Sequence, residues 1–233
     1  RAAGGEVVGT TKMDQLAYSL VGNVGEGDPP INVFDTDSYC GGSSSGSASA
    51  VAADAADIGV GTDTAGSIRV PAAACGLFGF RPTHSRVETV GVVPLAPSFD
   101  VVGFLTHDPA ALRNVMTVVG TRLTARKGPA RILFPSDVWA MQDPFDSAAA
   151  LAASERIRYE LDAEIIYEPL RQFFDPAAGD LLARLQGREI WAQHEHWVTD
   201  NANVLADDVQ LRLRGCASLA ADSLEVQRVD RDT

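Results

Sequence analysis

Two short turns made of glycine and serine carry the residue types best suited to chemistry in this sequence. They read GGSSSGS at 41–47 and GTDTAGSIR at 61–69, so that Ser43 and Ser67 are 24 residues apart. An acyl-transfer site needs a nucleophilic hydroxyl, a group that takes its proton, and backbone N–H donors aimed at the developing oxyanion. The small residues at 64–67 let successive N–H groups converge on one point. From the residues alone, catalysis and tight packing at a glycine turn are equally open.

The segments around these turns favour a compact α/β unit over a flexible linker. We expect a helix of small residues at 48–53 and a buried strand at 58–61, which together place the two turns close in space. Elsewhere the pattern predicts strands at 6–9 and 131–134, strand-like pieces at 90–102, a helical turn at 13–19, a helix followed by a strand at 70–80, and helices at 108–119, 145–161 and 179–198. Strands that alternate with helices are typical of an α/β layered domain.

Residues 41–81 resemble, without a gap, the signature of the amidase signature family, whose members hydrolyse carboxylic amides with a Ser–Ser–Lys triad. The match runs through GGSSSGSASAVAA and GVGTDTAGSIRVPAAACGLFGFRPT, and it is flanked by VGTTKMD at 8–14 and VPLAPSFD at 93–100. The resemblance implies an α/β/α layered domain with a mixed central sheet, incomplete at both ends. It also implies a single domain over 1–233, with a core signature at 41–81 and a variable helical, substrate-side segment at about 135–233.

The resemblance assigns roles by position. Ser67 would be the nucleophile that becomes acylated, and Ser43 would be the bridging serine, preceded by a cis peptide bond after Gly42. We expect the hydroxyls of Ser43 and Ser67 to lie within hydrogen-bonding reach. The oxyanion hole would be formed by the backbone N–H groups of Thr64, Ala65, Gly66 and Ser67, and the turns would be supported by Asp63, Arg69 and Ser44. No metal or cofactor is implied.

The base of the triad is not found at either lysine of the sequence, Lys12 or Lys127. A base lysine must be desolvated, because only a lowered pKa lets the amine accept a proton. In the family this lysine lies several tens of residues upstream of the bridging serine, in a motif that would precede Arg1. We therefore expect the intact protein to hydrolyse amides and these 233 residues alone to be inactive.

Other interpretations compete with this one. GSSSG at 42–46 satisfies the G-x-S-x-G elbow of α/β-hydrolases, which would make Ser44 the nucleophile with His84 or His107 as partner, but the preceding segment 35–40 is not strand-like. The missing lysine also permits a catalytically silent amidase-like subunit. Within the family, an amidotransferase or an allophanate-type hydrolase is the alternative. Segments 17–19 and 96–100 look similar to the branch that cleaves aryl-acetamides such as indole-3-acetamide.

The predicted helix at 179–198 contains two histidines and two tryptophans that could suggest a metal site or a substrate pocket. Their spacing favours neither. His194 and His196 stand at i and i+2, so their imidazoles point to different sides of the helix and cannot share a tetrahedral ion. We expect a solvated face there. Trp191 and Trp197 are expected to pack in a core rather than to line a substrate pocket.

The composition limits which partners and which cellular compartment are expected for this protein. A net charge of −12 argues against nucleic acid or an anionic membrane, and no apolar run reaches the length of a membrane span. The cysteines Cys40, Cys75 and Cys216 form no CxxC pair, which favours reduced thiols in the cytoplasm. The expected partner is a small-molecule amide, and a homodimer is left open.

Overall fold

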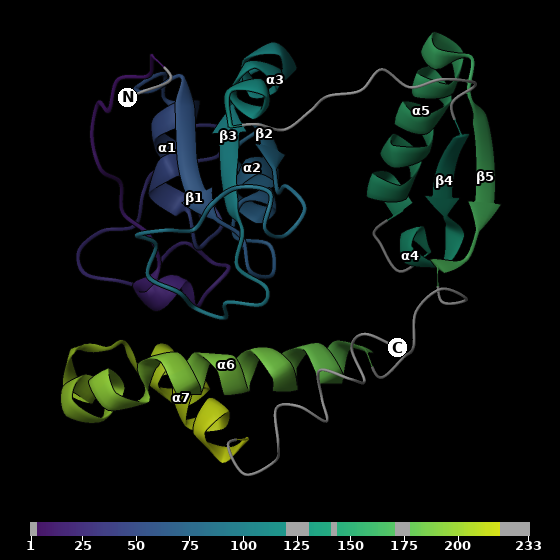
Figure 1. The fold of residues 1–233 in the computed structure, drawn as a ribbon. Helices are drawn as coiled ribbons and strands as arrows, with labels where there is room; N and C mark the ends of the chain where they lie inside the picture. Colours follow the sequence, from purple (N-terminus) through teal and green to yellow (C-terminus); the bar gives the residue numbers. More distant parts are fainter. Residues whose placement is uncertain (1–3, 120–130, 141–143, 171–177, 220–233) are drawn as a thin grey trace. The chain divides into compact units, whose positions relative to one another are not determined.

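The computed structural model describes residues 4–119, 131–140, 144–170 and 178–219 (Figure 1). The chain divides into two compact units, where the sequence predicts one domain. Unit 1 contains the described residues of Arg1–Leu123 and Ala183–Thr233, and unit 2 contains those of Thr124–Leu182. Each unit is built from helices and strands, as expected for the α/β class.

Unit 1 is organised around a three-stranded antiparallel sheet with the order β1-β3-β2. The strands are β1 (Ile58–Thr62), β2 (Phe78–Phe80) and β3 (Val102–Thr106), and Gly61 of β1 stands opposite Gly103 of the central strand. All five residues of β3 are buried. The predicted strand at 58–61 and the strand at the end of the segment 70–80 are therefore confirmed.

Two short helices cover one face of this sheet: α1 (Ser45–Ala52) and α2 (Arg69–Ala74). They approach closely because the contact residues are small. A Cβ placed on Gly59 would stand 3.0 Å from Ser47 O, and one on Gly79 would stand 2.4 Å from the Ala72 Cβ. The buried cluster between helices and sheet consists of Cys40, Ala48, Ala52, Ile68, Ala72, Cys75 and Leu105.

The helix at 109–118 forms as its sequence predicts. In α3 (Pro109–Val118), Pro109 occupies the first turn and the Asp108 carboxylate accepts a hydrogen bond from Ala111 N at 2.8 Å, which caps the helix. Met116 packs from this helix onto Val102 and Phe104 of β3.

The C-terminal helices of unit 1 pack on the loops that flank the sheet. These are α6 (Ala178–Asn201), the 3-10 turn η3 (Ala202–Val204) and α7 (Asp207–Ser218), and they meet the 3-10 turn η1 (Gln15–Ala17). The helix predicted at 179–198 is confirmed by α6, while α7 was not expected from the sequence. Their shared cluster is Val24, Leu95, Ala96, Ile190, Val198, Leu205, Val209, Leu213 and Cys216.

Residues of α6 divide between core and surface. Trp191 packs against the cluster as expected, while Trp197 is 44% exposed. The expected solvated face holds for His196, whose side chain is 98% exposed, and is wrong for His194. His194 is buried, and its Nε2 bonds Pro94 O at 2.8 Å, because the loop before β3 covers this turn of the helix.

Three predicted features differ from the structure. Residues 6–9 form no strand, and Val7 and Val8 are largely exposed. The segment 90–101 consists of turns, since Pro94 and Pro97 have no N–H to donate to a sheet. Strand β1 is not fully buried: side chains alternate along a strand, so α1 covers Gly59 while Ile58 and Val60 are 42% and 57% exposed.

Unit 2 is a β–α–β unit. Its strands β4 (Arg131–Pro135) and β5 (Glu164–Glu168) are parallel, and α4 (Ser136–Trp139) and α5 (Pro144–Leu161) lie between them in the chain. The predicted strand at 131–134 and helix at 145–161 are confirmed. The described residues thus hold two sheets, the antiparallel one of unit 1 and the parallel pair of unit 2.

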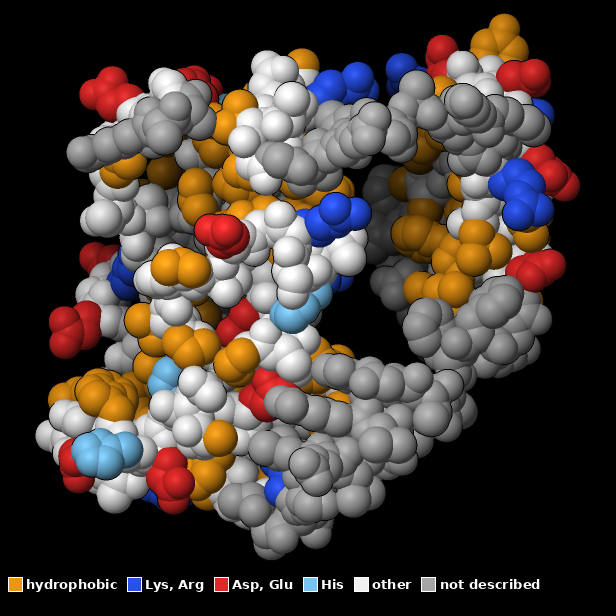
Figure 2. All heavy atoms as spheres, viewed as in Figure 1, with side chains coloured by type: hydrophobic (Ala, Val, Ile, Leu, Met, Phe, Trp, Pro, Cys, Tyr) orange, Lys and Arg blue, Asp and Glu red, His pale blue; other side chains and the backbone are white. Residues whose placement is uncertain are grey.

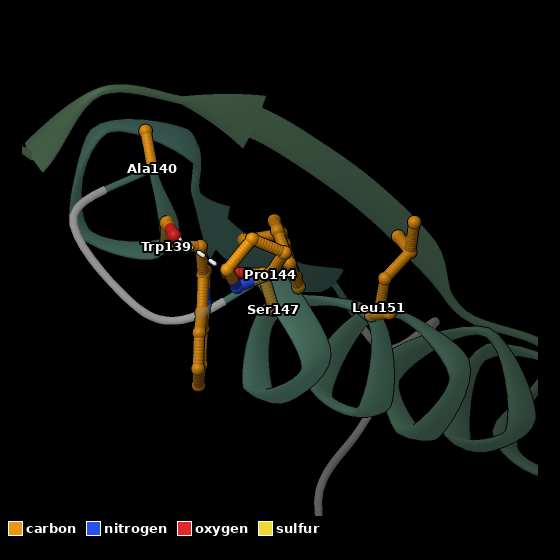
Figure 3. Close-up of a pocket in the computed structure, with 7 residues that line it drawn as sticks. Trp139, Ala140, Pro144, Ser147 and Leu151 are labelled. Carbon is orange, nitrogen blue, oxygen red and sulfur yellow. Dashed lines mark hydrogen bonds between the residues drawn. The ribbon is translucent and has the colours of Figure 1, made fainter.

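A cavity of about 400 Å³ opens in unit 2 between α4 and the first turns of α5 (Figure 3). Phe134 and Trp139 stack in its wall with their ring centroids 5.6 Å apart. Ser147 also lines the cavity, and its hydroxyl is already used in a hydrogen bond to Trp139 O at 2.7 Å. This cavity offers apolar contact and no group suited to bond making.

The surface carries acidic side chains spread singly over the face shown in Figure 2, with hydrophobic side chains exposed between them. No helix among the described residues combines the length and the apolar character needed to cross a membrane.

We expect Gly46→Ala to destabilise the protein. A Cβ at Gly46 would stand 2.5 Å from Lys12 O and 2.6 Å from Lys12 N, and these backbone atoms cannot rotate away. The strain should lower the free energy of unfolding by about 1–3 kcal/mol, measured by urea or thermal denaturation. Gly215→Ala in α7 is the matched control, because its Cβ meets nothing within 4 Å and alanine favours a helix by up to about 1 kcal/mol. Equal unfolding midpoints for the two variants would contradict this packing.

Candidate active site

The glycine–serine loop at 41–46 is held in place by the segment 12–24. The peptide bond between Gly42 and Ser43 is cis, as the family resemblance implies. Asp14 N donates to Ser43 O at 3.1 Å, and Gly42 N donates to Leu20 O at 2.9 Å. These two bonds, one on each side of the cis peptide, fix the backbone that presents the Ser43 hydroxyl.

Asp14 is the residue that organises this segment, and sequence reasoning assigned it no role. Its carboxylate is 1% exposed and accepts hydrogen bonds from Gly22 N at 3.0 Å and Val24 N at 2.8 Å. A Cβ on Gly42 would stand 2.0 Å from Asp14 Oδ2, so only glycine fits there. Asp14 is the last residue of the segment VGTTKMD at 8–14, which the family resemblance already includes. A single aspartate in a sequence does not show which backbone N–H groups it will accept from.

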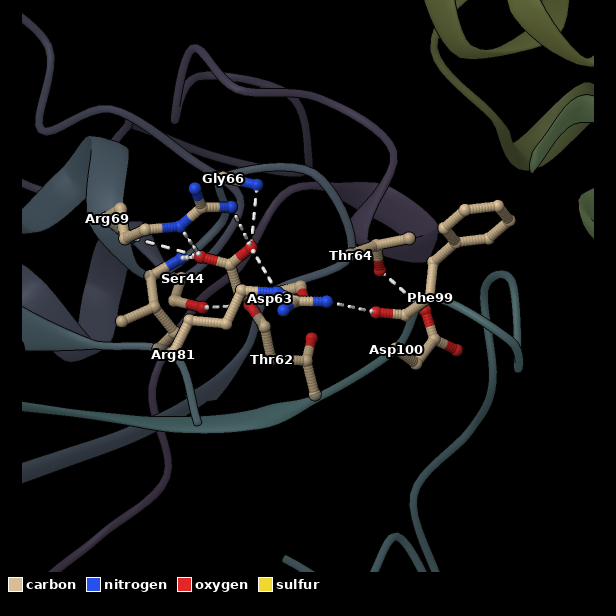
Figure 4. A network of polar contacts seen from close by, with 10 residues as sticks. Ser44, Thr62, Asp63, Thr64, Gly66, Arg69, Arg81, Phe99 and Asp100 are labelled. Atoms are coloured by element: carbon tan, nitrogen blue, oxygen red, sulfur yellow. Dashed lines mark hydrogen bonds and ion pairs between the residues drawn. The ribbon is translucent and has the colours of Figure 1, made fainter. Parts of the chain in front are cut away.

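The second turn is built around the Asp63 carboxylate, which is fully buried (Figure 4). It accepts from the backbone N–H of Gly66 at 2.7 Å, Ile68 at 3.1 Å and Arg69 at 3.3 Å. The Arg69 guanidinium adds two bonds, from Nε at 3.0 Å and from Nη2 at 2.9 Å. Asp63 and Arg69 thus hold the turn, which is the geometry that a supporting role requires.

The electrostatics of this pair favour the charged state of Asp63. Burial by itself raises the pKa of the Asp63 carboxyl, but the hydrogen bonds from Arg69 and from the Ile68 N–H outweigh it and leave the pKa below its ordinary value of 3.8. The same contact raises the pKa of Arg69. Arg81, which sequence reasoning also left without a role, lies 3.5 Å from Asp63 Oδ1 through its Nε.

The two serine turns lie against each other. Ser44 N donates to Ser67 O at 3.3 Å, and Ser44 Oγ donates to Thr62 O at 3.4 Å. A Cβ on Gly61 would stand 2.3 Å from Ser44 Oγ, so the contact depends on glycine at that position. Sequence reasoning therefore brought together the right segments.

The hydroxyls themselves are arranged differently from the expectation. The structure forms no hydrogen bond between Ser43 and Ser67: the Ser43 Oγ is buried and has no hydrogen-bond partner among the described residues. The hydrogen bond from Ser44 N to Ser67 O fixes the two backbones relative to each other. The positions of the Ser43 and Ser67 hydroxyl oxygens then depend on the rotation of each side chain. Ser43 thus keeps a hydroxyl able to donate and accept in a buried position.

Of the four expected oxyanion donors, one is engaged elsewhere. The Gly66 N–H donates to Asp63 Oδ1 at 2.7 Å, which corrects its expected place in the oxyanion hole. Within the described part of the chain, no hydrogen-bond acceptor is found for the N–H groups of Thr64, Ala65 and Ser67. Three backbone donors of the turn are therefore left without an acceptor among the described residues.

The lysine that the structure describes is unsuited to act as a base. The Lys12 ammonium donates to the carbonyl oxygens of Glu26, of Gly27 at 3.0 Å and of Asp28 at 2.7 Å. The Lys12 ammonium is thus committed to three backbone carbonyl groups. Lys127 lies outside the described residues.

The hydrolase-elbow alternative lacks its partners. His84 bonds Pro97 O and Ser85 Oγ, and His107 lies 3.2 Å from Asp54 through Nε2, so neither imidazole contacts Ser44. Residues 35–40 form a turn and an isolated bridge instead of the strand that an elbow follows.

A cavity of about 870 Å³ in unit 1 runs along β1, residues 6–11 and Met13, and reaches Ser44, Ser47 and His194. Ser43 and Ser67 are not among its lining residues, and Ser67 is 4% exposed. The cavity therefore does not coincide with the two serines.

Comparison with known proteins agrees with the geometry. Residues 1–153 match the family described as Amidase. The chain belongs to the amidase family. Amidase 1 of Arabidopsis thaliana is 51% identical over 117 residues, which cover 50% of this chain and 28% of that protein. The indoleacetamide hydrolase of Pseudomonas syringae pv. syringae is 34% identical over 230 residues, covering 88% of this chain and 50% of that protein.

A solved amidase structure shares the fold. It superposes with a TM-score of 0.83 at 26% identity, covering 94% of this chain and 50% of that chain. This amidase-family chain therefore spans half or less of the length of the relatives named here.

We expect Asp63→Asn to lower the free energy of unfolding by about 2 kcal/mol at neutral pH, because a buried charged acceptor of several hydrogen bonds is lost. The pKa of Asp63 is depressed in the folded state, so its stabilisation is complete above the ordinary value of 3.8 and is lost as the pH falls through the lower folded value. The stability gap between wild type and variant should accordingly narrow below about pH 4, as measured by urea denaturation across pH.

Asp108→Asn is the control for this measurement, because asparagine caps a helix as well as aspartate does. Its stability should stay within about 0.5 kcal/mol of the wild type at neutral pH. A gap for Asp63→Asn that is unchanged down to pH 2 would show that the carboxylate charge does not hold the turn.

Proposed function

We propose that the complete protein hydrolyses a carboxylic amide through an acyl-enzyme, with Ser67 as the nucleophile. The observation that carries this proposal is the contact of the two serine turns at Ser44 N and Ser67 O, 3.3 Å apart, beside three N–H groups without acceptors in the described residues. Membership of the amidase family supports the same chemistry.

In the proposed reaction the Ser67 hydroxyl attacks the amide carbon and forms the new C–O bond. Its proton passes through the Ser43 hydroxyl to a base. The oxyanion of the tetrahedral intermediate accepts hydrogen bonds from the N–H groups of Thr64, Ala65 and Ser67. Cleavage of the C–N bond returns a proton to the leaving nitrogen and releases ammonia or an amine. Water then attacks the ester, and the acid leaves with Ser67 restored.

Ser43 has the properties that a proton relay needs. It is fully buried, its backbone is fixed by Asp14 N, and its hydroxyl has no competing partner among the described residues. The base that receives the proton is assigned, as the family resemblance implies, to a lysine that is not in this sequence; Lys12 is committed to three carbonyl groups. The support of the turn is assigned to Asp63 and Arg69.

A small aryl-acetamide is the substrate class we favour. The alignment with the indoleacetamide hydrolase extends over 88% of the chain, so it includes much of the helical segment at 135–233 that the resemblance marks as substrate-side. Segments 17–19 and 96–100, on which the expectation first rested, both contribute to the cluster formed with α6 and α7: Ala17, Tyr18, Ala96 and Phe99 pack there.

The test is mutation of the serines in the complete protein, assayed by ammonia release from indole-3-acetamide and by labelling with a fluorophosphonate probe. Ser67→Ala should abolish labelling and lower kcat by at least about 10³-fold. Ser43→Ala should slow both acylation and turnover. Ser44→Ala is the matched control, because Ser44 is equally buried and its structural contact to Ser67 is made by the backbone.

Each alternative has its own outcome. Labelling that survives in Ser67→Ala and disappears in Ser44→Ala would identify the hydrolase elbow instead. A wild-type protein that is folded but takes up no probe at Ser67 would identify a catalytically silent subunit. Labelling of Ser67 without hydrolysis of the aryl-acetamide would refute only the substrate class.

A further inference from the structure

Thr64 opens the turn that carries the proposed oxyanion donors, and its side chain is bound by a residue from another part of the chain. Thr64 Oγ1 donates to Asp100 Oδ1 at 2.5 Å, and both side chains are buried, at 8% and 7% exposure (Figure 4). We propose that Asp100 is a positioning residue for amide hydrolysis: through Thr64 it orients the N–H groups of Thr64 and Ala65 toward the oxyanion. This inference rests on the function proposed above.

The turn needs a second anchor because Asp63 holds only its later half. The Asp63 carboxylate accepts from Gly66, Ile68 and Arg69, while the N–H groups of Thr64 and Ala65 lie before these contacts. At the start of the turn, Asp63 N donates to Val101 O at 2.8 Å. Between these fixed points, the Thr64 hydroxyl makes the one side-chain hydrogen bond of Thr64 and Ala65 within the described residues. Two carboxylates therefore divide the turn between them.

Asp100 is itself held rigidly. Its Oδ2 accepts from Leu95 N at 2.8 Å, and Ala96 N lies 3.1 Å from both carboxylate oxygens. Asp100 N in turn donates to Ala96 O at 2.9 Å, which closes the loop 95–100 on itself. Two backbone donors thus hold the Asp100 carboxylate against its own loop, so the position of the loop determines where the Thr64 hydroxyl is held.

The loop is tethered to the rest of unit 1 at two points. Arg81 donates from Nη2 to Phe99 O at 2.9 Å and from Nε to Asp63 O at 3.1 Å, which ties the loop to the turn. The Glu189 carboxylate of α6 accepts from Ser98 N at 2.9 Å and from the Ser98 hydroxyl. Helix α6 is thus connected to the turn with the proposed oxyanion donors: Glu189 binds Ser98, and Asp100 of the same loop binds Thr64.

The expected effect is on the transition state rather than on the bound substrate. As a general rule, oxyanion donors lie about 2.7–3.1 Å from the oxygen on which charge develops. A peptide group that rotates away therefore reduces the stabilisation of the transition state more than the binding of the substrate. Loss of the Thr64 hydroxyl should therefore lower kcat and leave KM nearly unchanged. A role in folding alone would lower the fraction of active protein and leave the turnover of each active site as it is.

The experiment compares Thr64→Val, which keeps the side-chain volume, with Thr64→Ser, which keeps the hydroxyl, in the complete protein. Turnover is expressed per active site titrated with the fluorophosphonate probe. We expect Thr64→Val to lose about 10–100-fold in kcat with KM within about threefold, and Thr64→Ser to recover most of the loss. A boronic-acid analogue of the tetrahedral intermediate should bind more weakly to Thr64→Val by the same factor as kcat/KM falls.

Thr62→Val is the matched control, since Thr62 lies two residues earlier and its side chain forms no hydrogen bond with another described residue; its kcat should equal that of the wild type. Asp100→Asn provides a second test if Thr64→Val does not fold. Asp100→Asn also changes the acceptor for Leu95 N and Ala96 N, so it is expected to lose at least as much kcat as Thr64→Val. The double variant Thr64→Val/Asp100→Asn should lose no more kcat than Asp100→Asn alone, because Thr64 acts through Asp100. The inference about Asp100 would be overturned, without affecting the proposed function, by a wild-type kcat per active site in Thr64→Val. Losses of kcat that add fully in the double variant would overturn it as well. Absence of Ser67 labelling in the wild type would overturn the proposed function instead.

Discussion

The geometry of the candidate site depends on one buried carboxylate. Asp63 has no exposed surface and accepts five hydrogen bonds from three residues of its own turn. Burying that charge is tolerable only because donors surround it, and burying the amides is tolerable only because the charge accepts from them. The turn is therefore held in a shape in which the Gly66 N–H bonds Asp63, while the N–H groups of Thr64, Ala65 and Ser67 are left for another acceptor.

Steric limits explain why the second loop docks against this turn. Cβ atoms on Gly42 or Gly61 would come within 2.0 Å of Asp14 Oδ2 and 2.3 Å of Ser44 Oγ, distances that no side chain tolerates. The glycines that suggest a flexible linker in the sequence instead permit backbone contact inside a packed unit. As a result, Ser43 and Ser67 belong to adjacent loops, with Ser43 buried and its hydroxyl unbonded among the described residues.

Support for the site comes from several separate segments of unit 1. Asp14 stabilises the loop of Ser43, Arg81 and Asp100 stabilise the turn of Ser67, and Glu189 fixes the loop that carries Asp100. The β–α–β unit formed by 131–168 contributes an apolar cavity and, in its described residues, no group of this network. Proposed chemistry and its support are thus concentrated in the unit that contains the signature.

The sequence by itself determined what depends on neighbours in the chain: the two serine turns, the family, the Asp108 cap of α3, and most helices and strands. Only the tertiary structure decided which donor each buried carboxylate meets. The partners of Thr64 and Ser98 are 36 and 91 residues away, at Asp100 and Glu189. The burial of His194 and the exposure of Ile58 and Val60 were decided in the same way. Local propensity carries no information about such contacts, because they arise when distant segments pack together.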